Sequence, residues 1–295
     1  MVRRLSVEPE VEKVLALDVR PGSYRHDKVF FQYYDVAEPA AGLLRREGVN
    51  AVIHLAFVLR PSRRRERAQQ VNLKGTQKVL EECLLGGVRH ILYLSSGTVY
   101  GAYGDHRQPL KEEAPLRPNR GFQYAEDKVV VEGYLKAFTE RHAQVTVTVL
   151  RSCVVMGPGA ENFITQAFRK PMLIGIRGQD PPMQFLHQDD LSELMMGLLM
   201  KPVAGVFNVA GEGSVRYSEL VRLSGRRCLW LPAAVAYALT GWTWSLGLQG
   251  DSPAVGLDLI RWPWMVDMEK VGSVAGFHPR HTSREALASY FSQGE

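Results

Sequence analysis

The chain has 295 residues, of which 45% are hydrophobic and 23% are charged. This composition supplies a large core and excludes a disordered or fibrous protein. A net charge of +5 and a pI near 9.1 would suit nucleic acid or acidic lipids, and five arginines lie between Arg60 and Arg67. No aromatic residue is interleaved with them for base stacking, so we interpret them as a solvated face and expect no nucleic-acid partner.

Three cysteines, Cys83, Cys153 and Cys228, are odd in number and widely spaced. This usage suits a reducing compartment and offers no metal-like cluster, so we interpret the cysteines as packing residues and expect no metal. No N-terminal signal peptide is visible, and no apolar run reaches the ~18 residues that a membrane-spanning helix needs. We therefore expect a cytoplasmic protein without a membrane span.

Along the chain, apolar strand-like runs alternate with helical patterns. The strand-like runs cover residues 29–34, 51–57, 90–94 and 145–150, and the helical patterns cover residues 65–85 and 122–142. Such alternation predicts an α/β fold in which helices wrap a parallel sheet. After residue 158 the regularity weakens and Pro171, Pro181 and Pro182 interrupt the chain. This second part is expected to form mostly a smaller lobe, interleaved with returns to the main sheet.

Tyr124 and Lys128 are four residues apart, so on a helix they face one pocket. An ammonium beside a phenol favours the phenolate, and we expect Lys128 to lower the pKa of Tyr124 from about 10. Ser96, at the end of the strand-like run 90–94, is the candidate that holds a substrate oxygen. A Tyr-x-x-x-Lys pair alone is common on amphipathic helices. The order of strand, serine, loop and helix indicates hydride-transfer chemistry.

Seven further segments in chain order carry a family resemblance; they are residues 50–56, 71–76, 94–101, 150–158, 185–190, 206–210 and 277–279. On these segments the chain resembles the extended short-chain dehydrogenase/reductase family, in particular its NAD-dependent epimerase/dehydratase branch. The resemblance implies a Rossmann-like, doubly wound parallel sheet, with an NAD-binding domain over residues 1–158 and mostly a substrate-binding lobe over residues 159–295. It implies that Ser96 orients the substrate oxygen, Tyr124 exchanges the proton, and Lys128 tunes the phenol and holds the nicotinamide ribose.

The resemblance also implies contacts with NAD. Asp18 would accept hydrogen bonds from the adenosine ribose, which favours NAD over NADP, although Arg20 nearby softens the preference. Asp35 and Val36 would contact the adenine. The remaining cofactor-binding residues implied are Leu55, Ala56, Asn72, Tyr124, Lys128 and Ser152. From the residues alone, the two aspartates also suit turns, Leu55 and Ala56 suit a core, and Asn72 suits an N-cap.

The chain departs from the family at its start. The family's first strand and its Gly-x-x-Gly-x-x-Gly turn, which holds the cofactor pyrophosphate, are missing. Residues 1–5 correspond to the middle of the first helix and residues 11–18 to the second strand. Without the central strand, two buried sheet edges would keep unpaired backbone groups and the domain should fold poorly. We expect a truncated gene model or a missed upstream start; the alternative is a cofactor-free relative that kept the scaffold.

The expected activity is that of an NAD-dependent oxidoreductase or epimerase acting at a hydroxyl/carbonyl carbon of a sugar nucleotide or of an apolar alcohol or ketone. Met183 and Gln184 stand where nucleotide-sugar members usually carry an arginine, and Arg177 is near in sequence. No carboxylate follows Ser96 directly, so a dehydratase ranks below an epimerase or a reductase. The alternative is a non-catalytic ligand-sensing or scaffold relative. Family members commonly pair through the helices that carry the Tyr and Lys, which suggests a homodimer.

Five tryptophans gather in the C-terminal part: Trp230, Trp242, Trp244, Trp262 and Trp264. Residues 231–248, which include two of them, form an apolar stretch. We interpret these tryptophans as the core of the smaller lobe; an apolar pocket or a membrane-leaning flap are the alternatives.

Overall fold

The computed structural model describes residues 1–61, 65–160 and 163–292. Its main sheet has four strands in the order β10, β5, β4, β3, with the bounds Gly205–Val209, Thr146–Ser152, His90–Ser96 and Ala51–His54. All three strand pairs are parallel. The α/β fold with a parallel sheet, expected from the alternating pattern, is confirmed.

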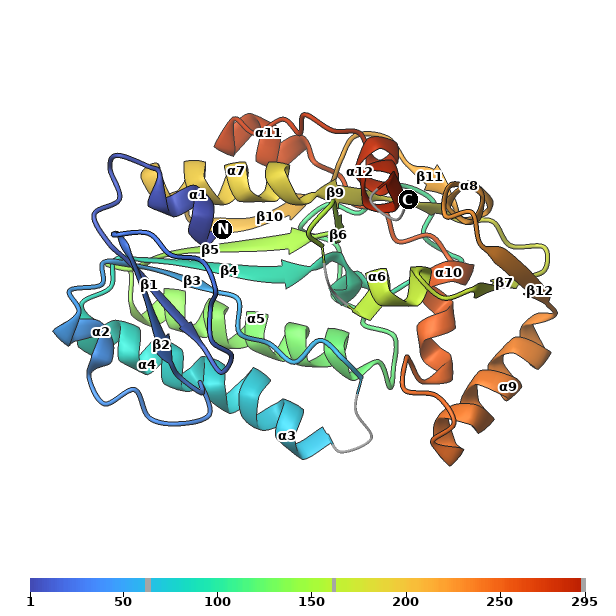
Figure 1. The fold of residues 1–295 in the computed structure, drawn as a ribbon, viewed down its shortest axis with the longest axis horizontal. Helices are drawn as coiled ribbons and strands as arrows, with labels where there is room; N and C mark the ends of the chain where they lie inside the picture. The colour runs from blue at the N-terminus through green and yellow to red at the C-terminus, as the bar shows by residue number, and fades with distance from the viewer. Residues whose placement is uncertain (62–64, 161–162, 293–295) are drawn as a thin grey trace.

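Helices cover both faces of this sheet (Figure 1). On one face lie α4 (Thr76–Gly86) and α5 (Gln123–Arg141), and on the other lie α7 (Gln188–Met200) and α11 (Glu269–Ala275). Strand β4 is buried on both sides, which explains its nearly continuous apolar run. The core under α4 and α5 includes Val79, Leu80, Ile91, Val131, Leu135, Val147 and Val149.

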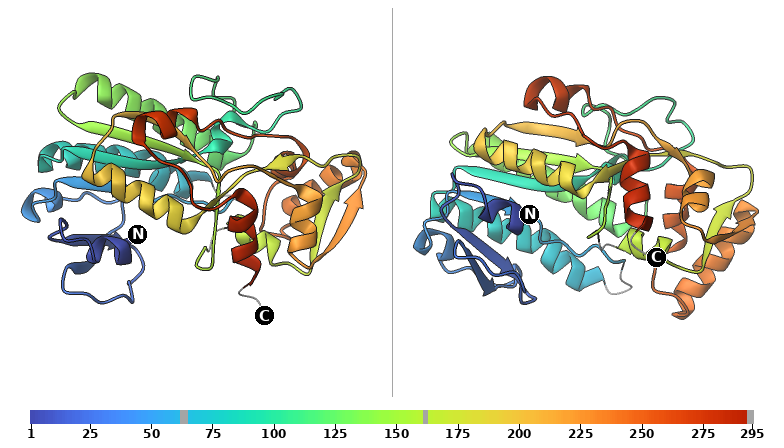
Figure 2. Two further views of the ribbon diagram at one scale, coloured as in Figure 1. Left: turned by 90° about the horizontal axis from the view of Figure 1, so that it is seen from above. Right: turned by 45° about the horizontal axis from the view of Figure 1, so that its top comes forward.

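The first two strands form a separate parallel pair. Strand β1 (Val14–Asp18) pairs with β2 (Val29–Tyr33), and no further strand of the described residues pairs with β1 or with the outer edge of β3. Figure 2 shows this pair set apart from the main sheet, with helix α1 (Val2–Ser6) beside it. The two unpartnered edges expected from the sequence are therefore present.

Residues 163–182 and 213–264 are called the smaller lobe below. Its parallel strands are β7 (Met172–Ile176) and β12 (Arg227–Leu231). Its helices are α6 (Phe163–Phe168), α8 (Tyr217–Leu223), α9 (Ala233–Leu246) and α10 (Asp258–Arg261), with a 3₁₀ turn, η3 (Ala254–Leu257). Between this lobe and the main sheet lie two short pairs, parallel β6 (Val154–Met156) with β9 (Phe185–His187) and antiparallel β8 (Pro182–Met183) with β11 (Val215–Arg216), and helix α12 (Ser283–Phe291). The chain returns to the main sheet through β10.

One expected helix is interrupted. The helical pattern over residues 65–85 forms α3 (Arg65–Gln69), a π-helical segment η1 (Gln70–Gly75) and then α4. At Gly75 the segment packs closely on Val36, because a Cβ there would lie 2.7 Å from Val36 Cγ2. Single π-helical turns are frequent at functional sites. Of the other connections, α2 (Leu43–Arg46) follows β2, and the 3₁₀ turn η2 (Gly97–Tyr100) follows β4.

The interpretation of the tryptophans as lobe core is only partly right. Trp264 is 4% exposed and packs in the core, whereas Trp242 on α9 is 61% exposed. The cysteines pack as expected, with Cys83 and Cys153 buried and Cys228 half-buried. Within the described ranges, no helix combines the length and the apolar character needed to cross a membrane. Arg63 and Arg64 of the arginine-rich stretch lie outside the described residues.

Candidate active site

Strand β4 and helix α5 bring the Ser96 hydroxyl and the Tyr124 phenol together. Figure 1 shows β4 and β5 pointing toward the smaller lobe, at the end where α5 begins. The Ser96 and Tyr124 side chains share a hydrogen bond. Ser96 Oγ also accepts from the backbone N of Thr98 at 3.2 Å and from Thr98 Oγ1 at 2.9 Å, as the N-cap of η2. The serine oxygen is thus fixed at the carboxyl end of its strand.

The Tyr124 ring is held by two aromatic neighbours. Phe57 meets it edge-on with the ring centroids 5.6 Å apart, and Phe122 with the centroids 6.1 Å apart. Burial raises the pKa of Tyr124 to about 12, although the hydrogen bond with Ser96 opposes this. The expectation that Lys128 lowers this pKa is wrong here, because burial dominates and Lys128 Nζ lies 5.8 Å from the ring centroid. The phenol therefore stays protonated at neutral pH.

Lys128 is buried one helical turn after Tyr124 on α5. Its Nζ donates to the backbone oxygen of Leu94 at 2.6 Å and lies 3.8 Å from the Phe57 ring centroid and 4.4 Å from that of Tyr93. Burial lowers the pKa of Lys128 to about 7, and the charge of Glu132 opposes this. The carbonyl and the ring faces favour the ammonium form. The Lys128 side chain therefore changes charge near physiological pH.

Asn72 lies in η1 and joins the loop after β3 to helix α5. Its Oδ1 accepts from the backbone N of Val58 at 2.7 Å, and its Nδ2 donates to Asp127 Oδ2 at 2.9 Å. Gln123 also donates to Asp127, at 3.4 Å. Burial raises the pKa of the Asp127 carboxyl. The N-cap interpretation of Asn72 is wrong, since the residue lies inside η1 and holds a loop instead.

The residues expected on the adenosine side lie on the β1–β2 pair and its exits. Asp18 is exposed at the end of β1, and its Oδ1 accepts from the backbone N of Arg20 at 2.9 Å. Both residues line a hollow of about 500 Å³ along β2. Asp35 Oδ1 accepts from the backbone N of Ala37 at 2.9 Å, in a turn. Val36 is 9% exposed and packs in the core, so its side chain is not available to a ligand.

Three more expected residues lie at strand ends. Leu55, 48% exposed, and Ala56, also exposed, follow β3 directly, so the interpretation of this pair as core is wrong. Ser152 is buried at the end of β5 and is paired in register with Ser96. Ligands of parallel sheets bind outside the carboxyl ends of the strands. The structure thus gathers Ser96, Tyr124 and Ser152 at the carboxyl end of the main sheet, while Asp18 belongs to a separate strand pair.

These groups fit NAD in part. An exposed carboxylate at Asp18 can accept hydrogen bonds from ribose hydroxyls, and the exposed side chains of Leu55 and Ala56 offer apolar surface to a flat ring. Tyr124 and Lys128 provide a hydroxyl and an ammonium for a second ribose. The printed sequence has no glycine-rich turn, so the pyrophosphate has no such cradle among these residues.

Sequence reasoning missed a buried charged network beside the site. Glu132 lies one turn after Lys128 on α5, and Arg151 of β5 donates to it through Nε at 3.0 Å and Nη2 at 2.7 Å. Ser95 Oγ donates to Glu132 at 2.5 Å, and Arg151 Nη1 donates to the Tyr100 hydroxyl at 2.7 Å. The signals were the four-residue spacing from Lys128 and a lone arginine within an apolar strand.

The segment that lacks the family's usual arginine has a structural role. Met183 is 4% exposed, and the Gln184 amide accepts from Val266 N at 2.8 Å and donates to Val266 O at 3.2 Å. Arg177 donates from Nε to the Trp230 oxygen at 2.9 Å, at the exposed end of β7. Met183 and Gln184 are therefore engaged in packing and in backbone hydrogen bonds.

Known proteins share this fold and these motifs. The sequence pattern of the NAD dependent epimerase/dehydratase family matches residues 1–210. An uncharacterized protein of Mycobacterium tuberculosis is 24% identical over 304 residues, which covers 99% of this chain and 79% of that protein. A GDP-6-deoxy-D-mannose reductase of Pseudomonas aeruginosa is 31% identical over 207 residues, which covers 64% of this chain and 67% of the reductase.

Solved structures agree on the fold. MoeE5 in complex with UDP-glucuronic acid and NAD superimposes with a TM-score of 0.76 at 23% identity, covering 99% of this chain and 93% of MoeE5. A dTDP-glucose 4,6-dehydratase of Bacillus anthracis in complex with NAD gives a TM-score of 0.73 at 17% identity, covering 99% and 90%. The chain belongs to the NAD dependent epimerase/dehydratase family. It is an enzyme of that Rossmann-like class with NAD as its cofactor, as the sequence motifs predicted.

Proposed function

We propose that the chain exchanges a hydride between NAD and a carbinol or carbonyl carbon of a sugar nucleotide, as a reductase or an epimerase. The observation that carries the proposal is the hydrogen bond between Ser96 and Tyr124 above the buried amine of Lys128. NAD supplies the hydride or accepts it when bound. A substrate oxygen placed between the serine and tyrosine hydroxyls receives a hydrogen bond from one and exchanges a proton with the other.

Each residue has a distinct part in the reduction direction. The pKa of Tyr124, raised by burial to about 12, keeps the phenol protonated, so it can deliver the proton to the oxygen as the carbonyl carbon gains hydride. Ser96 donates to the same oxygen and stabilises its developing negative charge. The Lys128 ammonium stabilises the phenolate left behind. In the oxidation direction the same phenolate takes up the proton.

The substrate class rests on relatives. The reductase similar to this chain acts, by its name, on a GDP-linked deoxy sugar, and MoeE5 was solved with UDP-glucuronic acid. Without an arginine at Met183 or Gln184, we propose that a cation elsewhere meets the diphosphate. Arg65 lines a cavity of about 230 Å³ beside Phe122, which contacts the catalytic phenol. An apolar alcohol or ketone is the second substrate class.

The experiment is a substrate panel with two readouts: the absorbance of reduced nicotinamide for net oxidation or reduction, and chromatography of the sugar for epimerisation, which leaves no net reduced nicotinamide. UDP-glucose, UDP-glucuronic acid and a GDP-linked deoxy sugar are each mixed with NAD or NADH and the folded chain, beside the free sugars and a long-chain alcohol. Turnover of a nucleotide sugar, and none of its free sugar, supports the proposal. Turnover confined to the alcohol would replace sugar nucleotides with the apolar class.

A non-catalytic ligand-sensing or scaffold role is the second candidate. The unpartnered edges of β1 and β3 favour it, because they border the strands that would hold the cofactor. Calorimetric titration with NAD and NADH distinguishes the two roles, since a scaffold without cofactor binds neither. We also propose that residues 1–158 bind the cofactor, that residues 159–295 mostly bind the substrate, and that two copies pair through α5, the helix that carries Tyr124 and Lys128.

A further inference from the structure

Helix α9 exposes an apolar face that the fold leaves uncovered. The helix carries no charged residue, and helices that are apolar all round are normally buried. All of α9 is described, and within it Ala236 alone is buried. Four large side chains at helical spacing are exposed: Val235 at 49%, Leu239 at 42%, Trp242 at 61% and Leu246 at 58%. They form one stripe along the helix.

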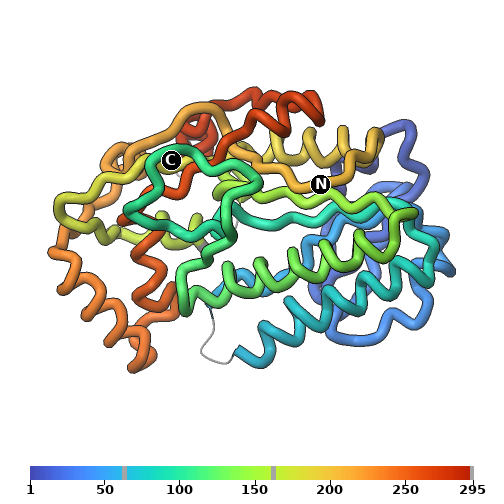
Figure 3. Tube along the Cα trace, turned by 180° about the vertical axis from the view of Figure 1, so that it is seen from behind, coloured from blue at the N-terminus to red at the C-terminus, as the bar shows by residue number. Residues whose placement is uncertain are grey.

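The stripe faces away from the protein. The opposite side of α9, with Ala236 and Tyr237, packs on Ile174 and Ile176 of β7. Just past the helix end, Leu248 is 67% exposed and extends the apolar surface. Figures 1 and 3 both show α9 at the outer end of the smaller lobe, away from the main sheet. A flat partner can therefore reach the stripe without meeting the rest of the molecule.

The smaller lobe as a whole is positively charged. The smaller lobe contains eight arginines and lysines against four aspartates and glutamates, so it holds most of the chain's net charge of +5. Arg177 is exposed beside the start of α9, where its backbone N donates to the Leu231 oxygen at 2.8 Å. Arg227 is exposed at the start of β12. An apolar stripe containing tryptophan, with Arg177 near its start and a positively charged lobe behind it, matches an anionic lipid surface.

We propose that α9 docks the protein on the surface of a bilayer that contains anionic lipids. Leu239 and Trp242 enter the boundary between headgroups and acyl chains, while Arg177 and Arg227 lie at the level of the lipid phosphates. A second copy of the chain is a poorer occupant of this face. A two-fold contact would place the positive lobe against itself, and like charges would oppose the apolar attraction.

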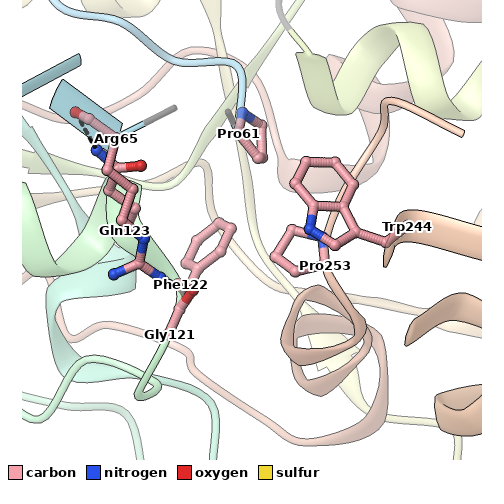
Figure 4. A pocket seen from close by; sticks show the side chains of 7 residues that line it. All are labelled: Pro61, Arg65, Gly121, Phe122, Gln123, Trp244 and Pro253. Atoms are coloured by element: carbon pink, nitrogen blue, oxygen red, sulfur yellow. Dashed lines mark hydrogen bonds between the residues drawn. The ribbon is translucent and has the colours of Figure 1, made fainter. Parts of the chain in front are cut away.

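The other side of α9 borders the candidate active site. Trp244, on the side of α9 opposite the stripe, lines the cavity of about 230 Å³ together with Pro253, across from Phe122 and Arg65 (Figure 4). Phe122 in turn contacts the Tyr124 ring. When the stripe is docked, α9 would therefore lie between the bilayer and this cavity. The docking itself does not depend on the proposed function.

The test is flotation of the full chain with vesicles. We expect binding to vesicles of phosphatidylcholine with one third phosphatidylglycerol, at least tenfold weaker binding to pure phosphatidylcholine, and loss of binding as salt rises. The double variant Leu239→Gln/Trp242→Gln should lose at least tenfold in binding. The matched control is Leu85→Gln, because Leu85 is 67% exposed on α4 and should leave binding unchanged.

Further variants keep the outcome decisive. Arg177→Gln/Arg227→Gln leaves the stripe intact and should reduce binding to the anionic vesicles only. Circular dichroism melts show whether each variant is folded, and Leu246→Gln replaces the double variant if that one is not. Absence of wild-type flotation with anionic vesicles, or unchanged flotation of the folded stripe variants, overturns the proposal. If the wild-type chain does not bind vesicles but sediments as a dimer, and the stripe variants sediment as monomers, the face binds a second copy of the chain instead.

Discussion

Lys128 Nζ donates to the backbone oxygen of Leu94 at 2.6 Å, and this hydrogen bond ties helix α5 to strand β4. Two residues beyond Leu94 the strand ends at Ser96, and one turn before Lys128 the helix carries Tyr124. This bond therefore helps to hold together the two elements that supply the proposed catalytic hydroxyls. Lys128 is a structural tie as well as a charge, which the Tyr-x-x-x-Lys spacing alone does not reveal.

Replacing Lys128 should stabilise the protein while abolishing turnover. Burial lowers the pKa of Lys128 from 10.5 to about 7 in the folded chain. Between these pH values the unfolded chain binds more protons, so this group makes the free energy of unfolding rise with pH, and its penalty is full below pH 7. We expect Lys128→Met to raise the free energy of unfolding by about 1–3 kcal/mol at pH 7.

The gain from Lys128→Met should shrink toward pH 10, which urea denaturation at several pH values measures. The control is Lys136→Met, an exposed lysine on the same helix, for which we expect a change within about 0.5 kcal/mol at every pH. A gain that does not depend on pH would contradict a buried lysine with a lowered pKa.

Replacing the neighbouring residues Ser96 and Ser95 should affect catalysis and stability differently. Successive side chains of a strand point to opposite faces, and Ser96 bonds to Tyr124 while Ser95 bonds to Glu132 at 2.5 Å. We expect Ser96→Ala to lower kcat by about 10²–10³ with little change in Tm, because a donor to the substrate oxygen is lost. Ser95→Ala should lower Tm and retain most of kcat. Equal kcat losses in both variants would refute the assignment of Ser96.

Removing either partner of the Glu132–Arg151 ion pair alone should destabilise the protein strongly. Both side chains are 6% exposed, so removing one partner leaves a buried charge without compensation. We expect Glu132→Gln or Arg151→Met alone to lower the free energy of unfolding by about 3–5 kcal/mol. The double variant should lose less than the sum of the two. Additive losses in chemical denaturation would show that the pair is not coupled.

Hydrogen exchange should show the two unpartnered strand edges. Amides of β1 and β3 that point away from β2 and β4 have no strand partner among the described residues. We expect them to exchange faster than amides of β4 and β5, which are paired on both sides. Mass spectrometry of peptides from each strand measures this. Equal protection in β3 and β4 would indicate that another strand covers the edge.

Much of the main domain follows from the sequence. The apolar run that became β4 lies between two helix layers, so its lack of alternation correctly indicated a buried parallel strand. The prediction of one continuous helix over residues 65–85 was wrong. The apolar period does not reveal the π-helical turn that forms where Gly75 packs on Val36. That turn places Asn72 against Asp127, a contact between distant parts of the chain.

The placement of the candidate residues in the fold was predictable, and their electrostatics was not. Ser96 ends a strand and Tyr124 and Lys128 lie on one helix, as the motif order indicated, while their catalytic roles stay predictions. The direction of the Tyr124 pKa shift depends on how deeply Phe57 and Phe122 bury the ring, which only the packed structure shows. The exposure of Trp242 was missed for a related reason. Composition says that α9 is apolar, but tertiary contacts decide which face is covered.

The most direct measurement compares the turnover of the Tyr124→Phe variant with that of Tyr134→Phe. The second variant also removes a phenol hydroxyl, but ten residues further along the same helix. On any substrate that the wild-type chain converts with NAD, we expect Tyr124→Phe to lose about 10²–10⁴ in kcat while its NAD affinity stays within about threefold. Tyr134→Phe should retain wild-type kcat. Turnover of Tyr124→Phe at the wild-type rate would contradict the role of Tyr124 as the proton donor and acceptor.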